Sequence, residues 1–214
     1  MRVAIVDYGS GNLRSAAKAF ERAAKDCASN CEVMVSGNPE VIAKADRVVL
    51  PGVGSFTGCM SGLAKVEGLI DALEKAVRSR AVPFFGICVG LQLMATQGEE
   101  HGVHAGLGWV SGKVRILKPA DKSLKVPHMG WNELHLKKPA HPLFAGVAEG
   151  GHAYFVHSYH FVPDEADVVG ACVDYGGPVT AAIVKDNMFG TQFHPEKSQS
   201  LGLTLIANFL NWRI

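Results

Sequence analysis

The 214-residue sequence has no excess of either charge: 21 Lys and Arg stand against 20 Asp and Glu, a formal net charge of +1. The basic residues are scattered, so the electrostatic footprint of a protein that binds nucleic acid or a membrane surface is missing. A long apolar run at the start is also missing, because only four apolar residues separate Arg2 from Asp7, too few for a signal peptide or a spanning helix. We therefore expect a soluble, cytoplasmic protein that binds neither nucleic acid nor a membrane.

Cysteine is scarce and shows no pairing pattern. The five cysteines are odd in number and include no Cys-x-x-Cys pair, which fits a reducing compartment better than a disulfide framework. Cys27 and Cys31 could pair under oxidation, although chance spacing is the favoured explanation. The chain also lacks a linker, repeat or low-complexity tract, and 48% hydrophobic residues suffice for a sizeable core. We predict a single domain over residues 1–214.

The most informative stretch is residues 82–94, where an apolar run passes directly into a helical pattern. The turn between them reads Gly-x-Cys-x-Gly, the pattern of a nucleophile elbow with sulfur in place of oxygen. Side chains at Gly86 and Gly90 would collide with neighbouring backbone in such a turn. A helix that follows at once would favour the thiolate at its N-terminus. The pattern therefore predicts that Cys88 is a nucleophile and not a buried structural cysteine.

The first half of the chain alternates strands and helices, which indicates a parallel sheet with helices on both faces. A helical segment at 57–80 is predicted to break near Gly62 and Gly68. The second half is strand-rich and joined by short turns, so we expect antiparallel additions that extend the same sheet, closed by a helix capped by Ser198 or Ser200. The predicted strands are 2–6, 32–35, 47–50, 82–87, 112–117, 129–136, 153–162, 168–173, 179–184 and 188–193.

A nucleophilic thiol needs a base, and the base needs a group that fixes its tautomer. His194 and Glu196 are suited to these roles, because residues i and i+2 of an extended segment point the same way and Pro195 stiffens the spacer. We predict a catalytic triad of Cys88, His194 and Glu196. Without the elbow, His194 would be taken for an ordinary histidine at the end of a strand.

No metal or other cofactor is predicted. His152, His157 and His160 are close in sequence, but strand alternation sends the last two to opposite faces, and no cysteine or carboxylate lies at ligand spacing. The turn Gly9-Ser10-Gly11 follows a strand, yet the third glycine of the dinucleotide fingerprint and the Walker lysine are both missing. A plain turn or a contact surface is the favoured interpretation of this segment.

Three motifs resemble the signatures of the class I, or triad, glutamine amidotransferases, in the same order and over nearly the whole chain. They are Pro-Gly-Val-Gly at 51–54, Gly-Ile-Cys-Val-Gly-Leu-Gln at 86–92 and Phe-His-Pro-Glu at 193–196. The resemblance implies a flavodoxin-like three-layer α/β fold and L-glutamine as substrate. It also implies a glutamyl thioester on Cys88, with His194 as base and then acid and Glu196 holding the imidazole.

The resemblance further implies how glutamine and the oxyanion are bound. The oxyanion would meet backbone N–H groups of Val89 and of the strand Gly52-Val53-Gly54, and each such donor is worth a few kcal/mol. The two glycines would let the peptide between them turn over at little steric cost, leaving the oxyanion hole unmade until a signal arrives. Gln92 and the backbone of Ser158 and Tyr159 would hold the amino-acid end of glutamine.

Four further stretches, at 7–15, 127–132, 155–160 and 194–198, are similar to one branch of this family. Members of that branch deliver ammonia to a (β/α)8 cyclase subunit in histidine biosynthesis, which implies a heterodimer. The branch places four residues near the partner: Tyr8, Asn12, Trp131 and Lys197. A core position for Trp131 and a merely solvated Lys197 are the structural alternatives.

Other functions stay open at this stage. One is a glutaminase subunit of another pathway, such as anthranilate, aminodeoxychorismate or pyridoxal phosphate synthesis. A second is a stand-alone cysteine hydrolase of γ-glutamyl bonds, which would work without a partner. A third is a non-catalytic binding subunit, against which the intact Cys88, His194 and Glu196 argue.

Overall fold

The computed structural model describes residues 1–26 and 31–214. Its centre is an eight-stranded sheet in the order β2-β1-β3-β4-β14-β13-β12-β9. The first five strands of that order run parallel and consist mainly of apolar residues, as expected where both faces of a sheet are covered. They are β1 (Arg2–Val6), β2 (Glu32–Ser36), β3 (Arg47–Gly52), β4 (Phe84–Cys88) and β14 (Met188–Thr191).

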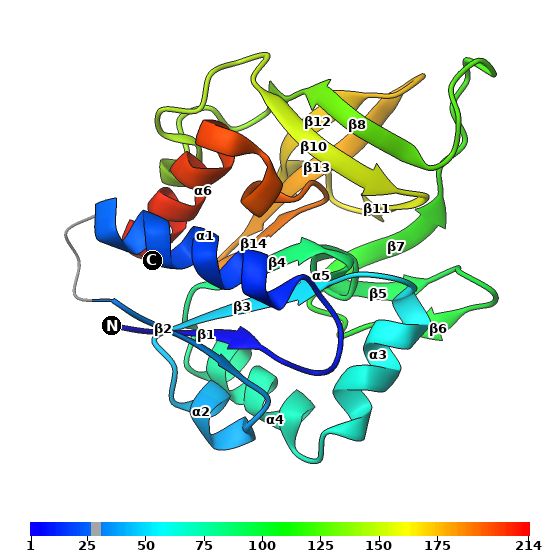
Figure 1. Cartoon of the computed structure of the whole chain (residues 1–214). Helices are drawn as coiled ribbons and strands as arrows, with labels where there is room; N and C mark the ends of the chain where they lie inside the picture. The colour runs from blue at the N-terminus through cyan, green and yellow to red at the C-terminus, as the bar shows by residue number, and fades with distance from the viewer. Residues whose placement is uncertain (27–30) are drawn as a thin grey trace.

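Helices cover both faces of the parallel strands (Figure 1). On one face α1 (Leu13–Asp26) packs against α6 (Gln199–Asn211), and on the other lie α2 (Pro39–Ala43), α3 (Phe56–Lys65) and α4 (Leu69–Leu73). Between α1, α6 and β4 the rings of Phe20, Phe85 and Phe209 have centroids 5.2 to 6.2 Å apart. This three-layer arrangement around a mostly parallel sheet confirms the predicted fold class.

The helical segment predicted over 57–80 breaks once where two breaks were expected. Helix α3 runs straight through Gly62, because this glycine serves close packing: a Cβ there would lie 2.9 Å from the ring of Tyr8. The break falls after Lys65, and Gly68, with φ of 75°, precedes α4. Helix α4 then continues into the π-helical turn η1 (Glu74–Ser79).

The second half forms more than one sheet, which corrects the expectation of a single extended sheet. Strands β13 (Pro178–Lys185), β12 (Val169–Asp174) and β9 (His135–Leu136) do extend the central sheet in antiparallel fashion. Strand β8 (His128–Glu133) instead pairs only with β10 (His152–His157), within the described residues. A four-stranded sheet contains β11 (Tyr159–Pro163), β7 (Val110–Ile116), β5 (Ala95–Gly98) and β6 (His104–Ala105).

Several strand predictions need correction in detail. The segment 129–136 is divided at Leu134 into β8 and β9, which belong to different sheets. The segment 153–162 is divided at Ser158, which sends its halves β10 and β11 to different sheets. Strand β14 is parallel to β4, because it returns between β4 and β13. Strands β5 and β6 were not predicted, since neither contains an apolar run. The remaining short helices are α5 (Val89–Gln92), η2 (Pro142–Phe144), η3 (Ala166–Val168) and η4 (Pro195–Lys197).

The three sequence motifs meet at the carboxyl ends of neighbouring strands. Gly52 of β3 is in register with Cys88 of β4, and Ile87 of β4 is in register with Thr191 of β14. The residues after β14 therefore bring His194 to the edge at which Cys88 stands. In open α/β sheets this edge is where ligands bind.

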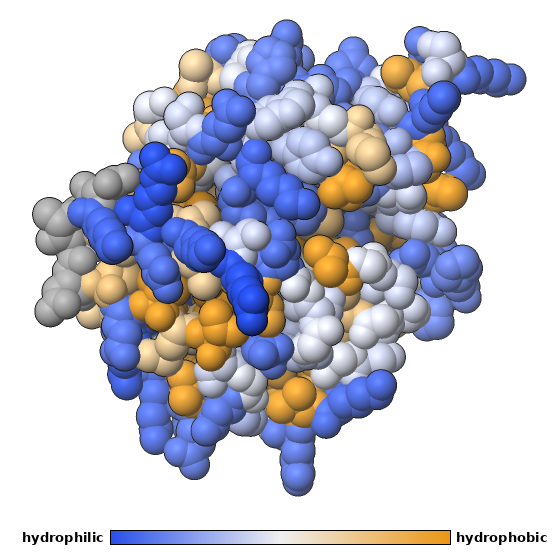
Figure 2. Space-filling model, in the orientation of Figure 1, coloured by the Kyte–Doolittle hydropathy of each residue, from blue (hydrophilic) through white to orange (hydrophobic). Residues whose placement is uncertain are grey.

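The surface is mixed in character. On the face shown in Figure 2, hydrophobic residues form separate patches among polar side chains. Three of the more exposed apolar side chains are Val53, Met129 and Trp131, at 44%, 64% and 47%. Across residues 1–26 and 31–214, no helix combines the length and apolar character needed to cross a membrane.

Candidate active site

Cys88 stands on a strained turn. Its φ of 56° and ψ of −110° lie in a region that residues with a side chain rarely adopt. The flanking glycines permit the turn: a Cβ on Gly86 would lie 2.7 Å from the Gly90 carbonyl oxygen, and one on Gly90 would lie 1.8 Å from the Leu50 carbonyl oxygen. The steric reason predicted for both glycines is confirmed, and the turn lifts the thiol to the end of the sheet.

The helix after the elbow is shorter than the apolar spacing predicts. Helix α5 contains only Val89–Gln92, and by Ala95 the chain has entered β5, which pairs with β7. Pairing with a neighbouring sheet overrides the helical pattern here. Only one helical turn therefore acts on the sulfur, and its dipole is much smaller than that of a long helix.

His194 is held by Glu196 and faces Cys88. Its Nδ1 lies 2.9 Å from Oε1 of Glu196, and each side chain is only 3% exposed. Burial lowers the pKa of His194, but hydrogen bonds with Cys88 and Glu196 outweigh it and raise that pKa to about 10. The imidazole therefore carries a proton at neutral pH and can pair with a thiolate. Pro195 and Glu196 lie in η4, so a 3₁₀ turn, and not the expected extended segment, brings the carboxylate to the ring.

The predicted oxyanion donor, the Val53 N–H, is already occupied by another hydrogen bond. The Val53 N–H donates to Oγ of Ser10 at 3.2 Å, and the Val53 carbonyl accepts from Ser10 at 2.8 Å and from the Cys59 thiol at 3.4 Å. The next residue, Gly54, has φ of 93°. In this conformation the Val53 N–H is engaged outside the cavity.

A cavity of about 330 Å³ opens in front of Cys88 and His194. Gly52 is absent from its wall, because this glycine packs against the Tyr8 hydroxyl and the elbow backbone. The wall contains the other residues predicted to bind glutamine or the oxyanion: Val53, Gly54, Val89, Gln92, Ser158 and Tyr159.

Sequence reasoning missed four residues that line the same cavity: Glu100, Pro127, Val156 and His157. Glu100 is the carboxylate of the wall, and its Oε2 accepts from the Phe56 N–H at 2.7 Å. It lies in a polar stretch beside Glu99 with no spacing that marks it. From the sequence alone, His157 is considered only as a metal ligand. Its position next to Ser158, in the stretch at 155–160, also indicates a place in the glutamine cavity.

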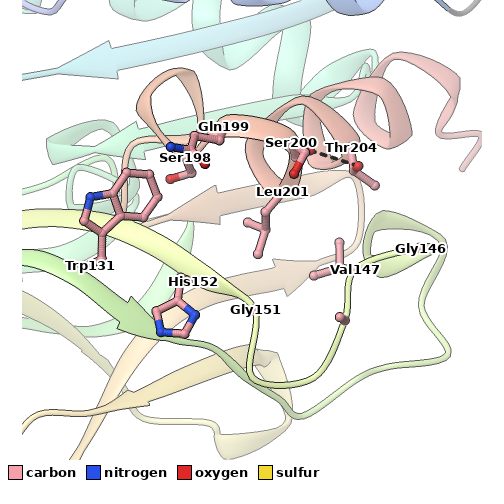
Figure 3. A pocket seen from close by; sticks show the side chains of 11 residues that line it. Trp131, Gly146, Val147, Gly151, His152, Ser198, Gln199, Ser200, Leu201 and Thr204 are labelled. Atoms are coloured by element: carbon pink, nitrogen blue, oxygen red, sulfur yellow. Dashed lines mark hydrogen bonds between the residues drawn. The ribbon is translucent and has the colours of Figure 1, made fainter.

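A second hollow, of about 380 Å³, lies between Trp131, the loop at Gly146 and Val147, and the first turn of α6 (Figure 3). It contains no triad residue. Cavity size alone therefore does not single out the candidate active site; the Cys88 elbow and the His194–Glu196 pair do.

The four residues predicted to face a partner differ in exposure. Trp131 is 47% exposed, so its alternative as a core tryptophan is wrong. Lys197 is also exposed, with Nζ 5.5 Å from the ring centroid of Tyr154, and Asn12 is half-buried. Tyr8, by contrast, is 5% exposed, and its hydroxyl donates to the Pro51 carbonyl at 2.8 Å. Its ring packs beneath the segment Gly52-Val53-Gly54, so it offers little area to a partner.

Within the described residues, no group of three or more His, Cys, Asp or Glu side chains is arranged to hold a metal ion. His157 and His160 lie on separate strands, β10 and β11, and not on opposite faces of one strand. The pairing considered for Cys27 and Cys31 involves Cys27, which lies outside the described residues.

Fold and site together have the architecture of a cysteine-dependent α/β hydrolase: a thiol on an elbow, opposed by a buried His–Glu pair. The family model "Glutamine amidotransferase class-I" matches residues 4–212, and the chain belongs to this family. It is a glutamine amidotransferase.

Related proteins match this sequence over its whole length. The sequence is 57% identical over 212 residues to imidazole glycerol phosphate synthase subunit HisH of Rhodospirillum rubrum, covering 99% of both chains. It is 57% identical over 216 residues to subunit HisH of Rhizobium meliloti, covering 100% of both. A crystal structure of a glutamine amidotransferase has a TM-score of 0.72 at 18% identity, covering 98% of this chain and 97% of that one, which supports the fold.

Proposed function

We propose that this chain is the glutaminase subunit of an imidazole glycerol phosphate synthase. One observation carries the proposal: relatives of that name match end to end at 57% identity, and the match includes a cysteine elbow set against a His–Glu pair. Residues 1–214 would act as one cytoplasmic glutaminase domain.

In the proposed reaction Cys88 and His194 begin as a thiolate and an imidazolium. The sulfur attacks the side-chain carbonyl of glutamine, and the tetrahedral intermediate collapses as His194 gives its proton to the departing nitrogen, releasing ammonia. The neutral imidazole then takes a proton from water, whose oxygen attacks the thioester. Glutamate leaves, and the thiolate and imidazolium are restored. Glu196 accepts the Nδ1–H throughout, which keeps Nε2 directed at the sulfur.

The cavity supports glutamine as substrate. Glutamine carries an ammonium and a carboxylate at one end, and the wall offers the Glu100 carboxylate, the Gln92 amide and the backbone at Ser158 and Tyr159. We assign Glu100 to the ammonium because the two carry opposite charges. This assignment adds a residue to the predicted binding set.

We further propose a heterodimer with a (β/α)8 cyclase subunit, to which ammonia passes without release to water. There it would react with an open-chain ribulosyl aminoimidazole nucleotide, giving imidazole glycerol phosphate and aminoimidazole carboxamide ribotide. The word "subunit" in the relatives' names supports an obligate partner. The exposed Trp131 supplies an aromatic contact of the kind enriched at interfaces, and the exposed Lys197 adds a positive charge on the surface.

The test is glutamate release from glutamine by the purified chain, alone and then with a cyclase barrel subunit and its nucleotide ligand. We expect little release alone and strong release in the mixture, because the Val53 N–H must first be freed. Strong release alone, unchanged by the barrel, would favour an independent γ-glutamyl hydrolase. Absence of release under both conditions would favour a non-catalytic subunit.

A further inference from the structure

Gln192 is a fully buried polar side chain that joins the nucleophile to the glutamine cavity. It follows β14 and lies two residues before His194. Its Nε2 donates to Sγ of Cys88 at 3.8 Å, and its Oε1 accepts from Nε2 of Gln92 at 3.0 Å. A buried amide is retained in a core when its hydrogen bonds are satisfied. Here one of its partners is the sulfur that would react.

The orientation of both amides follows from a single acceptor. The carbonyl of Tyr159 can only accept, so Gln92 must present its amide nitrogen there, at 2.9 Å. The second N–H of the same nitrogen points at Gln192, which must therefore present its oxygen. The amide nitrogen of Gln192 is thereby directed at Cys88. Donation to the sulfur is thus imposed by the neighbours of Gln192.

A chain of hydrogen bonds leads from the Tyr159 carbonyl to the Asp174 carbonyl. His157 Nδ1 donates to the same Tyr159 carbonyl at 2.8 Å, so its Nε2 accepts from Nδ1 of His128 at 3.1 Å. His128 Nε2 then accepts from Nδ2 of Asn132 at 3.4 Å, and the second N–H of Asn132 donates to the Asp174 carbonyl at 2.9 Å.

The chain requires both histidines to be neutral. Burial lowers the pKa of His128 to about 4 and is also the largest cause that lowers the pKa of His157 to about 3. At neutral pH each ring therefore has one donor and one acceptor nitrogen, as the chain demands. The Tyr159 carbonyl is held from two sides, by His157 and by Gln92.

We propose that Gln192 is a positioning residue of the glutaminase reaction, which holds the Cys88 sulfur through its amide nitrogen and Gln92 through its amide oxygen. This inference rests on the proposed function. Gln192 then donates to the same sulfur that interacts with His194. The thiolate is supported by an N–H that takes no part in proton transfer, while the same amide keeps Gln92 aimed at the substrate.

Two substitutions separate the two contacts, measured as glutaminase kinetics of the complex with the cyclase subunit. Gln192→Glu keeps an oxygen for Gln92 but presents oxygen to the sulfur, so we expect kcat to fall about tenfold to a hundredfold while KM for glutamine stays within about twofold. Gln192→Met has neither donor nor strong acceptor, so we expect the same loss in kcat together with a several-fold rise in KM.

A second measurement does not depend on glutamine chemistry. The rate at which iodoacetamide alkylates Cys88 in the full chain, followed by peptide mass, reports the nucleophilicity of the sulfur. We expect slower alkylation in both Gln192 variants. Asn187→Ser is the matched control, because Asn187 is another buried amide, whose nitrogen donates to the carbonyls of Val77 and Val82. It should lower Tm and leave alkylation and KM unchanged.

The results separate this inference from the function it rests on. Slow alkylation in both Gln192 variants supports the sulfur contact even if the chain hydrolyses no glutamine, in which case the proposed function fails alone. Wild-type alkylation and wild-type kcat in Gln192→Glu would overturn the inference. So would losses in both Gln192 variants that match those of Asn187→Ser at equal Tm, because they would show a purely structural role.

Discussion

Ser10 hydrogen-bonds both backbone polar groups of Val53: its hydroxyl donates to the Val53 carbonyl at 2.8 Å, and its oxygen accepts from the Val53 N–H at 3.2 Å. An oxyanion hole that uses the Val53 N–H cannot form until these bonds break. Gly54, with φ of 93°, can absorb the rotation at little steric cost. Ser10 lies between the turn of β1 and the oxyanion strand, and so connects a segment predicted to lie near the partner with the reaction centre.

Removing the Ser10 hydroxyl should therefore release the peptide. For Ser10→Ala we expect the glutaminase rate of the chain without its partner to rise about threefold to tenfold, because net hydrogen bonds of about 1 kcal/mol are lost from the resting conformation alone. The assay is glutamate release, with the surface variant Ser200→Ala as control. A basal rate equal to that of the control would show that Ser10 does not restrain the strand.

Glu196 should matter through the orientation and charge of His194. Glu196→Gln preserves size but replaces a carboxylate 2.9 Å from Nδ1, so we expect kcat in the activated complex to fall about a hundredfold or more. Cys88→Ser provides the zero reference, since it removes the nucleophile. Retention of more than half of the parent kcat by Glu196→Gln would exclude the carboxylate from the triad.

The buried histidines predict how stability depends on pH. Unfolded histidines bind a proton below about pH 6.5, whereas folded His128 and His157 stay neutral down to about pH 4 and about pH 3. The unfolded state thus binds more protons as the pH falls from 6.5, and the free energy of unfolding should decrease, by at most about 1.4 kcal/mol per pH unit for each histidine.

His194 has the opposite effect on the pH dependence of stability. Because its pKa is raised to about 10 in the folded state, its contribution to the free energy of unfolding is lost as the pH rises from 6.5 towards that value. We therefore expect a stability maximum near pH 6.5. Urea unfolding midpoints between about pH 5 and pH 9 measure it, and His128→Gln should flatten the acid side. A midpoint that keeps rising below pH 6 would contradict the neutral histidine chain.

Trp131 and Tyr8 should give opposite results in binding and stability. Trp131→Ala removes an exposed ring, so we expect the affinity for the cyclase subunit to fall at least about tenfold with Tm unchanged. Tyr8→Phe removes a buried hydroxyl whose pKa burial raises, so we expect about 1 kcal/mol of lost stability and little loss of affinity. Titration calorimetry and thermal unfolding test both. Equal losses of affinity would place Tyr8 in the interface after all.

Much of the candidate site could be predicted because its signals are local. The elbow at Cys88 is marked by two glycines, at which a Cβ would lie only 2.7 and 1.8 Å from neighbouring backbone oxygens. The His194–Glu196 pair is set by a two-residue spacing. The strand–helix alternation of the first half likewise follows from short-range hydrophobic periodicity. Where a second sheet competed for the chain, local pattern failed, as at Ser158, where one predicted strand became two.

The sequence by itself determined the α/β class and the candidate nucleophile, base and carboxylate, because each depends on neighbours in the chain. Only the tertiary structure decided what touches them. Gln192 meets Gln92 across 100 residues and Cys88 across 104, and Ser10 meets Val53 across 43. Such contacts depend on strand order and register, which bring β3, β4 and β14 side by side, and no spacing along the chain records that arrangement.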